Sequence, residues 1–404
     1  MILKKIKVLI TNHYLMNYAG SEITTLEIAM VLKNMGYEIN VATFIYDDPI
    51  KTEFEKNNIQ VFNLLEERLP FEEYDIAWCH HASVLSHILN SGVKIRNIIF
   101  RTLSPIHPLE ALPYYVDDID IVLATSGGTA ERYYSDGWID KKKIDVFPNS
   151  VPESFFVKSK NSQNRELKNI AIVSNHVPKE LSEAADILRN RSFKVDMLGL
   201  SNKYQIINPD ILLPYDVVIS IGKTVQYCFA LGIPVYCYDH FGGPGYITKN
   251  NFEKTEHYTF SGRCCNRHID AQALADEIIS GYNGALNILE HLKITAKEKY
   301  DLRTNVENVL KRLENIKVND VFYNRMFSRE IKMGIVHNEF YVEILKRSHD
   351  KNNFLFFDEE QKPKIERDFY SMKDEIWHCK NELNRIYNSR SWRYTEPLRN
   401  VGRI

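Results

Sequence analysis

KIKVLIT (Lys5–Thr11) and INVATF (Ile39–Phe44) are two short apolar segments, rich in β-branched residues, that decide the fold of the first part of the chain. Between them, Ser21–Met35 has the residue pattern of a helix, and Gly36-Tyr37 ends it. Apolar strands separated by amphipathic helices are typical of a parallel sheet that is covered on both faces. The segments therefore predict an α/β layer with right-handed crossover connections.

This alternation continues to about residue 124 and restarts after a polar stretch at Lys158–Lys168, which reads as a linker. The further strand-like segments are Ile59–Phe62, Tyr74–Trp78, Asn97–Phe100, Ile119–Ala124, Asn169–Val173, Phe193–Leu198, Val217–Ile221 and Pro234–Tyr238. We therefore predict two Rossmann-like domains, 1–155 and 156–316, that face each other across a cleft. Helical segments from about Asp270 to Ile316 are expected to end the second domain.

The last part of the chain, 317–404, is expected to be a helical extension. Apolar residues from Ile365 to Ile386 alternate in steps of four and three, which predicts a coiled coil over 365–386, with an amphipathic helix packed on its own domain as the alternative. The coiled coil would make a homo-oligomer or dock a partner. Beyond it, arginines surround Trp392, Tyr394 and Leu398. An anionic membrane surface attracts such a tail, although a solvated tail has the same composition.

The composition is that of a soluble globular protein, with 44% hydrophobic and 26% charged residues. The net charge of −2 argues against a nucleic-acid partner held by a global positive field. The apolar runs are far shorter than the roughly 20 residues of a membrane span, and the lysine-interrupted start does not read as a signal peptide. A cytoplasmic location is expected. Cys264-Cys265 can bind a soft metal, but no His/Cys cluster has zinc-finger spacing, so no metal site is predicted.

Ligands of open parallel sheets bind at the carboxyl ends of the strands, so the loops that follow strands are the candidate sites. Gly222–Thr224 follows Val217–Ile221 and opens a helix. Free N–H groups at a helix start, together with Lys223, suit phosphate oxygens. The segment is not a Walker motif, because Val217 stands where that motif needs its first glycine. Thr224 as a simple N-cap is the alternative.

Three other loops of the second domain are candidates for ligand contact. They contain Ser174, Asn175 and His176, then Gly199, and then Asp239 and His240. The first two loops suit a diphosphate or a sugar, although Asn175 and His176 can instead satisfy local backbone groups. Asp239 and His240 lie in a turn with three glycines and a proline, at the end of a strand, which favours a ligand-binding turn.

Polar residues also follow the strands of the first domain. Gly20 can let a ligand approach the backbone, and Ser21 can cap the helix that begins there. The segment has no GxGxxG run and so is not a dinucleotide fingerprint. His80, His81 and Arg101 follow two other strands and are expected to converge on one polar, candidate catalytic cleft. Each histidine taken alone is more often structural.

Together these features resemble a GT-B-fold glycosyltransferase of the family-4-like group that builds bacterial cell-surface polysaccharides. The segments that carry the resemblance are Ala19–Glu22, Val146–Val151, Ser174–Pro178, Gly222–Gly245, Ala230–Val235 and the tail segment Ser389–Arg399. Gly222–Gly245 and Ser174–Pro178 are similar to a subgroup met in O-antigen and capsule gene clusters. The tail is similar to a motif of many polysaccharide glycosyltransferases.

The resemblance implies a hexosyl- or deoxyhexosyltransferase that moves a sugar from a nucleotide sugar to a growing, lipid-linked glycan near the inner face of the membrane. The second domain would hold the donor, with Gly222–Thr224 at its diphosphate and Ser174–His176 and Gly199 lining the pocket. The first domain would hold the acceptor, with His80 near the transferred sugar. Such enzymes need no metal or other cofactor, because a helix terminus and basic side chains take over the charge of the leaving diphosphate. Asp118-Ile119-Asp120 has the letters of a metal-binding DxD motif but opens a strand instead of following one.

The sequence departs from the family signature at two positions. The signature has two glutamates eight residues apart, where this chain has Ile219 and Tyr227. Either the donor is bound differently, through Gln226, or the activity is altered. An inverting reaction would need a base, for which Glu22, His80 and His81 are candidates. A nucleotide-sugar epimerase and a non-catalytic scaffold in a polysaccharide-assembly complex are the alternative functions.

Overall fold

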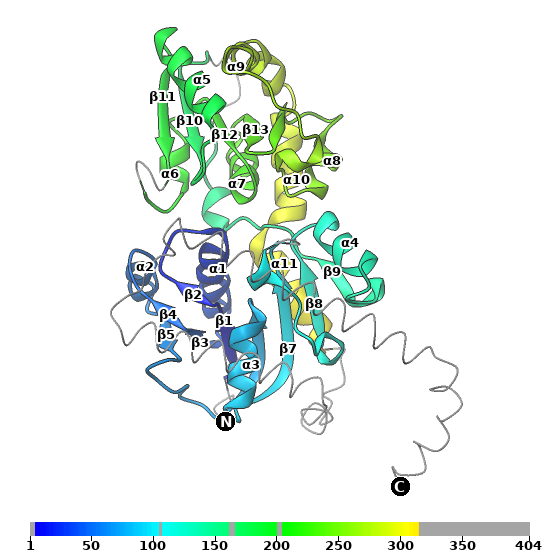
Figure 1. Cartoon of the computed structure of the whole chain (residues 1–404). Helices are drawn as coiled ribbons and strands as arrows, with labels where there is room; N and C mark the ends of the chain where they lie inside the picture. The colour runs from blue at the N-terminus through cyan, green and yellow to red at the C-terminus, as the bar shows by residue number, and fades with distance from the viewer. Residues whose placement is uncertain (1–4, 105–106, 161–165, 200–203, 315–404) are drawn as a thin grey trace, which may run out of the picture. The chain divides into compact units, whose positions relative to one another are not determined.

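The computed structural model describes residues 5–104, 107–160, 166–199 and 204–314, and the predicted coiled coil and tail lie outside them (Figure 1). The described chain forms two large β-sheets flanked by helices. The strands follow the predicted segments closely, so the prediction of an α/β fold with parallel sheets is confirmed. None of the described helices combines the length and the apolar character that a membrane span needs.

The first sheet has seven strands in the order β5-β3-β1-β6-β7-β8-β9, and all neighbouring strands run parallel. The strands are β1 (Lys7–Thr11), β3 (Glu38–Thr43), β5 (Gln60–Asn63), β6 (Glu73–Cys79), β7 (Lys94–Thr102), β8 (Ile121–Ala124) and β9 (Ile144–Val146). The flanking helices are α1 (Gly20–Asn34), α2 (Ile50–Lys56), α3 (Ala82–Asn90) and α4 (Gly127–Ser135), and β2 (Tyr14–Leu15) pairs with β4 (Ile45–Tyr46) in a small separate sheet. The chain leaves β1 towards β3 and β5 and returns on the other side of β1 with β6. The loops after β1 and β6 therefore lie at the switch point, where ligands of such sheets bind.

The second sheet has five strands in the order β11-β10-β12-β13-β14. The strands are β10 (Asn169–Val173), β11 (Lys194–Leu198), β12 (Val217–Ser220), β13 (Val235–Asp239) and β14 (Gly242–Tyr246). The helices that follow in this part of the chain are α5 (Lys179–Asn190), α6 (Pro209–Leu212), α7 (Lys223–Leu231), α8 (Phe252–His257), α9 (Ala271–Leu286) and α10 (Leu289–Tyr300). Strand order reverses between β11 and β12, which lie on either side of β10. The switch point of this sheet therefore lies at the loops after β10 and β12.

Both faces of each sheet are buried. Val8, Leu9 and Ile10 are consecutive residues of β1 and all have 0% exposure, although their side chains alternate between the two faces. In the second sheet, Ile170 of β10 belongs to one apolar cluster and its neighbour Ala171 to another. Burial on both faces explains why these strands read as continuous apolar runs and not as alternating ones.

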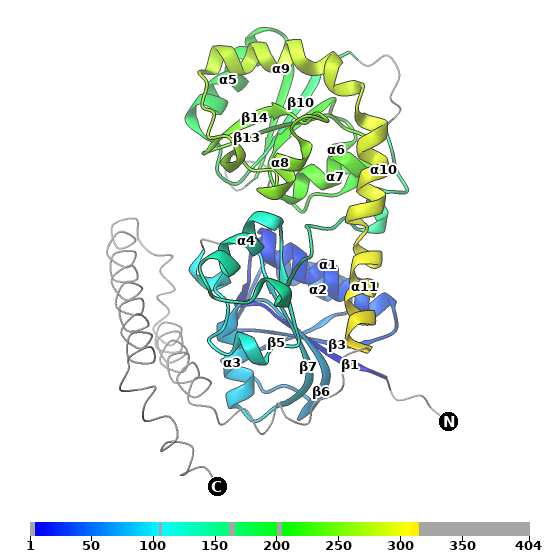
Figure 2. The ribbon, with the colours of Figure 1, turned by 90° about the vertical axis from the view of Figure 1, so that its right-hand side faces the viewer.

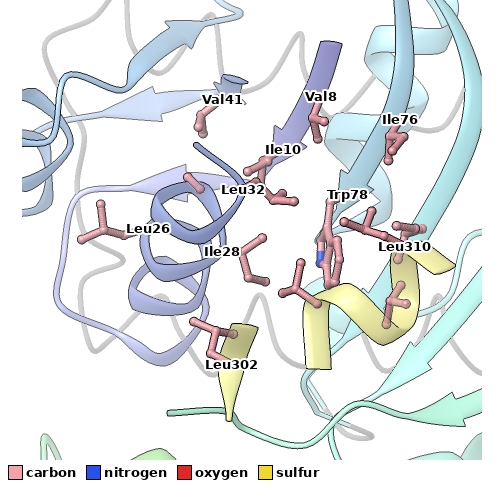
Figure 3. Packing of buried hydrophobic residues seen from close by; sticks show 14 of the residues in the cluster. Val8, Ile10, Leu26, Ile28, Leu32, Val41, Ile76, Trp78, Leu302 and Leu310 are labelled. Atoms are coloured by element: carbon pink, nitrogen blue, oxygen red, sulfur yellow. The ribbon is translucent and has the colours of Figure 1, made fainter. Parts of the chain in front are cut away.

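The last described helix, α11 (Leu302–Glu314), packs in the core of the first sheet and not of the second. Its residues Leu302 and Leu310 lie in one cluster with Ile28 of α1 and Trp78 of β6 (Figure 3). The preceding helix α10 contributes to the core of the second sheet (Figure 2). Our expectation that the helices up to residue 316 belong to the second domain is therefore wrong for α11, because its apolar residues pack with those of α1 and β6.

The chain passes between the two sheets twice, and the two passages are hydrogen-bonded to each other. The Val151 N–H donates to the Tyr300 carbonyl oxygen at 2.7 Å, and the Leu302 N–H donates to the Val151 carbonyl oxygen at 3.0 Å. Val151 and Asp301 thereby form a single parallel bridge outside both sheets. The segment Val146–Val151, which contributes to the family resemblance, thus ends at one of two adjacent connections.

Candidate functional site

At the switch point of the first sheet, His81 is held by two partners. Its Nδ1 accepts a hydrogen bond from the His13 N–H at 2.9 Å, and its Nε2 lies 3.3 Å from Glu110 Oε1. The acceptor role of Nδ1 assigns the proton of the neutral ring to Nε2, facing Glu110. The backbone of His81 has φ of 64°, a conformation that costs a non-glycine residue energy. His81 therefore ties the end of β1 to the start of α3.

His80 lies beside the same strand ends but differs from His81 in its partners. Its backbone N–H donates to the Thr11 carbonyl oxygen at 3.2 Å, and its side chain has 0% exposure. Neither ring nitrogen has a hydrogen-bond partner among the described residues. Burial, aided by the charge of Arg101, lowers the pKa of His80 well below its usual value. The backbone of Arg101 opposes this shift, and the ring is a neutral imidazole whose nitrogens make no well-aligned hydrogen bond among the described residues.

Arg101, at the end of β7, is buried and connects the first sheet to the segment that leaves it. Its Nη2 donates to the carbonyl oxygens of Phe147 and Pro148 at 3.2 and 3.3 Å. Burial lowers the pKa of Arg101 to about 9, although the carboxylates of Glu110 and Glu27 oppose the shift. Arg101 therefore contributes positive charge to the site while its side chain holds the backbone of the connection.

Glu22 organises the loop between β2 and α1. Its Oε1 accepts the N–H groups of Met16 and Asn17 at 2.6 and 2.9 Å, and its Oε2 accepts that of Ala19 at 3.2 Å. Burial raises the pKa of Glu22 to about 7, and the three backbone donors oppose this shift. These contacts give Glu22 a structural task at the position where we predicted a base.

The predicted ligand contacts of this loop lie at its end. The N-cap of α1 is Ala19, so the expectation that Ser21 caps the helix is wrong, because the helix begins one residue before it, at Gly20. Gly20 is exposed, and a Cβ added to it would meet no atom within 4 Å.

At the switch point of the second sheet, Gly222 is the N-cap of α7 with φ of 59°, and Lys223 is the first residue of the helix. The predicted helix start after β12 is thus present, and Thr224 is a helix residue and not its cap. The Gln226 amide nitrogen donates to the carbonyl oxygens of Gly222 and Lys223, in the orientation that satisfies both ends of the amide. Gln226 therefore supports the helix start from inside the fold.

Lys223 forms a buried ion pair with Glu27, a residue of α1 that the sequence analysis did not identify. The Nζ of Lys223 lies 2.5 Å from Glu27 Oε2, and the two side chains are 12% and 11% exposed. The Tyr227 hydroxyl donates to the other carboxylate oxygen, Glu27 Oε1. Burial raises the pKa of Glu27 and lowers that of Lys223, and their mutual attraction opposes both shifts. Glu27 stands four residues from Ile23 and from Val31 and so lies within an apolar stripe of the helix. A charged residue in such a stripe is the sequence feature that could have identified Glu27 as a buried site residue.

The two positions that depart from the family signature have different surroundings. Ile219 of β12 is a fully buried core residue. Tyr227 stacks on Phe155 with ring centroids 4.1 Å apart, while its hydroxyl reaches Glu27. A carboxylate is thus present beside position 227, but it comes from α1.

The loops after β10 and β11 lie against each other. Gly199 has φ of 153°, and a Cβ built on it would lie 2.0 Å from the Ser174 carbonyl oxygen. Ser174 Oγ accepts the N–H of His176 at 3.0 Å, and His176 itself is exposed. Asn175 is half-buried, with its Oδ1 close to Gly199. Only a glycine at position 199 allows this close approach of the two loops.

The predicted turn after β13 is mostly a strand. Gly242–Tyr246 forms β14, which pairs antiparallel with β13, and a Cβ on Gly243 would lie 2.0 Å from the Cys237 carbonyl oxygen. The glycines thus serve strand packing. Asp239 accepts the Phe241 N–H at 2.7 Å and the Ser261 hydroxyl at 2.9 Å, while His240 is exposed.

His80 and Lys223, which follow strands at the two switch points, therefore share one buried cluster of charged or titratable side chains with Glu27 of α1 and Arg101 of β7. Arg101 and Lys223 both lower the pKa of His80, and Arg101 lowers that of Lys223. His176 and His240 lie at the surface instead. Within the described ranges, no three or more His, Cys, Asp or Glu side chains are grouped so as to hold a metal. Asp120, of the DxD-like letters, accepts the Ile98 N–H at 2.7 Å.

Comparison with known proteins gives structural neighbours only. The sequence matches no protein-family model and no curated protein. HepE from Anabaena, solved with UDP and glucose, is 13% identical with a TM-score of 0.52, over 77% of this chain and 100% of that chain. A glycosyltransferase from Rickettsia africae is 18% identical with a TM-score of 0.53, over 78% and 100%. A mutant TarM from S. aureus, solved with fondaparinux, α-GlcNAc-glycerol and UDP, is 11% identical with a TM-score of 0.51, over 76% and 99%.

These identities are too low to define a family, but the likeness extends over the whole of the two-sheet fold. The described chain therefore has a fold similar to that of GT-B glycosyltransferases.

Proposed function

We propose that this protein is a glycosyltransferase that takes its sugar from a nucleotide-diphosphate donor. The observation that carries the proposal is Lys223, a buried lysine at the start of α7, at a switch point, which already has an anion at its ammonium group. A lysine at a helix start is suited to the oxygens of a diphosphate. The neighbours solved with UDP support a nucleotide as the ligand.

The donor would lie at the loops after β10, β11 and β12. Lys223 and the start of α7, with Gly222 and Thr224, would contact the diphosphate, whose negative charge they would stabilise as it leaves. Ser174, Asn175 and Gly199 would line the pocket, and Gln226 would hold the helix start in place. Asp239 and His240 end the next strand along the sheet and would contact the more distant part of the donor.

The acceptor would lie beside the first sheet. Of the three predicted bases, Glu22 and His81 have their polar atoms engaged, whereas neither ring nitrogen of His80 makes a well-aligned hydrogen bond among the described residues. Because its pKa is low, His80 stays neutral at pH 7 and can accept a hydrogen bond from an acceptor hydroxyl. Gly20 and Ser21 would border the acceptor, and Arg101 would add positive charge near the diphosphate.

The donor assignment predicts that one class of nucleotide raises the melting temperature and that Lys223→Gln abolishes the rise. A ligand at 100 times its Kd stabilises a protein by about 2.7 kcal/mol, enough for a shift of several degrees. The measurement is thermal unfolding with UDP-, GDP-, dTDP- and CMP-linked sugars. Gln keeps a donor for Glu27 but removes the charge, so the variant tests the charge itself.

Lys194→Gln is the control for this experiment. Lys194 is the first residue of β11 and lies at the amino ends of the parallel strands, whereas Lys223 follows the carboxyl end of β12. This control variant should shift with the nucleotide as the wild type does. If no nucleotide changes the melting temperature of the wild type, the donor site does not exist and the scaffold alternative replaces the enzyme.

We further propose that the acceptor is a growing, lipid-linked glycan of the O-antigen or capsule type, and that residues 317–404 hold the enzyme at the inner face of the membrane. The support is the resemblance of Ser389–Arg399 to the tails of polysaccharide glycosyltransferases. The coiled coil over 365–386 would pair chains or dock a partner.

The membrane proposal predicts that deleting Ser389–Ile404 releases the protein from anionic vesicles. Arg390, Arg393, Arg399 and Arg403 are lost with this segment, and each basic residue near an anionic surface contributes about 1 kcal/mol. Sedimentation with phosphatidylserine vesicles should show a loss of binding well above tenfold. Turnover of a soluble acceptor should not change. Equal binding of the truncated protein would contradict the proposal.

A further inference from the structure

Lys223, the lysine that we assign to the donor's diphosphate, is bound to a carboxylate of the chain itself. Glu27 approaches it to 2.5 Å, and both side chains are nearly nine-tenths buried. Lys223 and Tyr227 are four residues apart and so lie on the same face of α7, and both contact the same carboxylate. This face of α7 therefore offers an ammonium and a hydroxyl to an anion, next to the start of the helix.

We propose that the Glu27 carboxylate occupies the place of a donor phosphate, and that donor binding exchanges Glu27 for the diphosphate on Lys223. The inference rests on the proposed function, because it takes Lys223 as the contact of the diphosphate. A buried ammonium without a counter-charge is unfavourable. Glu27 removes that cost while the site holds no donor, and the diphosphate removes it afterwards.

The diphosphate has the means to displace Glu27. It carries more negative charge than one carboxylate, and it can accept hydrogen bonds from the free N–H groups at the start of α7 as well as from Lys223. Glu27 has to stay on α1, where its backbone is fixed by the helix. A ligand that follows the start of α7 can therefore use both features of the site, whereas Glu27 uses the side chains alone.

The exchange also couples the donor to the first sheet. Glu27 belongs to α1, and its partners belong to α7, so the ion pair and the tyrosine hydrogen bond join helices of the two sheets. When the diphosphate takes Lys223, the ion pair is lost, and the Tyr227 hydroxyl is the contact that still holds Glu27. Binding of the donor thus changes the contact between the part of the fold that binds it and the part assigned to the acceptor.

The test is the Kd of UDP and of inorganic pyrophosphate, measured by calorimetry for the wild type and for Glu27→Gln. Gln keeps an acceptor for the Tyr227 hydroxyl but no longer competes as an anion, so both ligands are expected to bind about tenfold more tightly or better. In the double variant Glu27→Gln/Lys223→Gln the gain should disappear, because it acts through Lys223. Glu277→Gln, which removes the carboxylate partner of Arg267 on helix α9, should bind like the wild type.

Tyr227→Phe is a second variant, which keeps the fold testable should Glu27→Gln prove unstable. It removes one of the two contacts of Glu27 and is expected to tighten binding by a smaller factor. Binding that is unchanged or weaker in both variants would overturn the exchange but leave the donor site in place. If neither ligand binds the wild type or the variants, the proposed function fails, and the exchange fails with it.

Discussion

Acidification from pH 7 to pH 4 is expected to lower the free energy of unfolding through His13, whose own contribution is about 3 kcal/mol. His13 follows β1 and is 1% exposed, and burial lowers its pKa from 6.5 to about 3. Below pH 6.5 the unfolded chain binds a proton at this histidine and the folded chain does not. Stability is therefore lost at about 1.4 kcal/mol per pH unit for such a group, down to the folded pKa.

Other groups with shifted pKa values add to this slope or oppose it. His80 acts in the same direction as His13, because burial lowers its pKa as well. Glu22 acts in the opposite direction, since its folded pKa of about 7 lies above its usual value of 4.5. Between pH 7 and pH 4.5 the folded chain holds a proton at Glu22 that the unfolded chain has lost, so this group gains stability as the pH falls. Glu27, whose pKa is also raised by burial, acts in the same direction as Glu22. The difference between the wild type and a His13 variant, and not the total slope, therefore measures the contribution of His13.

Urea unfolding at pH 7, 6, 5 and 4 measures this slope, and His13→Phe is the variant that tests its origin. The phenyl ring can pack against Phe44, whose ring centroid lies 5.3 Å from that of His13. The variant should lose stability on acidification about 1.4 kcal/mol per pH unit less steeply than the wild type. His291→Gln, at an exposed position of α10, is the control. Parallel curves for wild type and His13→Phe would contradict the assignment.

Gly199→Ala is expected to destabilise the protein by about 3 kcal/mol or more, because overpacking and backbone strain add at this position. The φ of 153° is unfavourable for alanine, and the new Cβ would lie 2.0 Å from the Ser174 carbonyl oxygen and 2.8 Å from its carbon. Both atoms belong to the backbone of the loop after β10, so neither can move without shifting that loop. Thermal unfolding measures the loss.

Gly20→Ala is the matched control for Gly199→Ala. Gly20 is the first residue of α1, and a Cβ there meets no atom within 4 Å. Alanine should therefore stabilise the protein by about 0.5–1 kcal/mol, since it restricts the unfolded chain and favours the helix. Equal melting temperatures for the two variants would show that the contact between Gly199 and Ser174 has no energetic weight.

The strands of both sheets could be predicted from the sequence because they are buried on both faces. KIKVLIT contains β1, and INVATF differs from β3 by one residue at each end. A continuous apolar segment between turn residues leaves few alternatives in a chain of this kind. The loop residues at the strand ends were predicted by the same argument, which is why Lys223 and His80 were found together with their place in the sheets.

Contacts between segments far apart in the chain could not be predicted from the local pattern of apolar and turn residues. β14 reads as a turn because its glycines and proline have low strand propensity, yet those glycines allow it to pack closely against β13. The apolar stripe of α11 predicts a packed helix, but the sequence does not indicate which of the two sheets the helix packs against. Glu27 was missed because a glutamate on a helix is usually solvated, and its buried partner is about 200 residues away in sequence.

The return of α11 to the first sheet sets an order of events during synthesis. The ribosome completes β1 about 300 residues before α11, which at 5–20 residues per second is roughly 15–60 s. Throughout that time the apolar surface beside Ile28 and Trp78 lacks its last helix. The core of the second sheet does not wait for α11, because α10 completes it and is synthesised before α11. The half of the molecule that is made first is therefore finished last, and the nascent first sheet has an exposed surface for a chaperone to recognise.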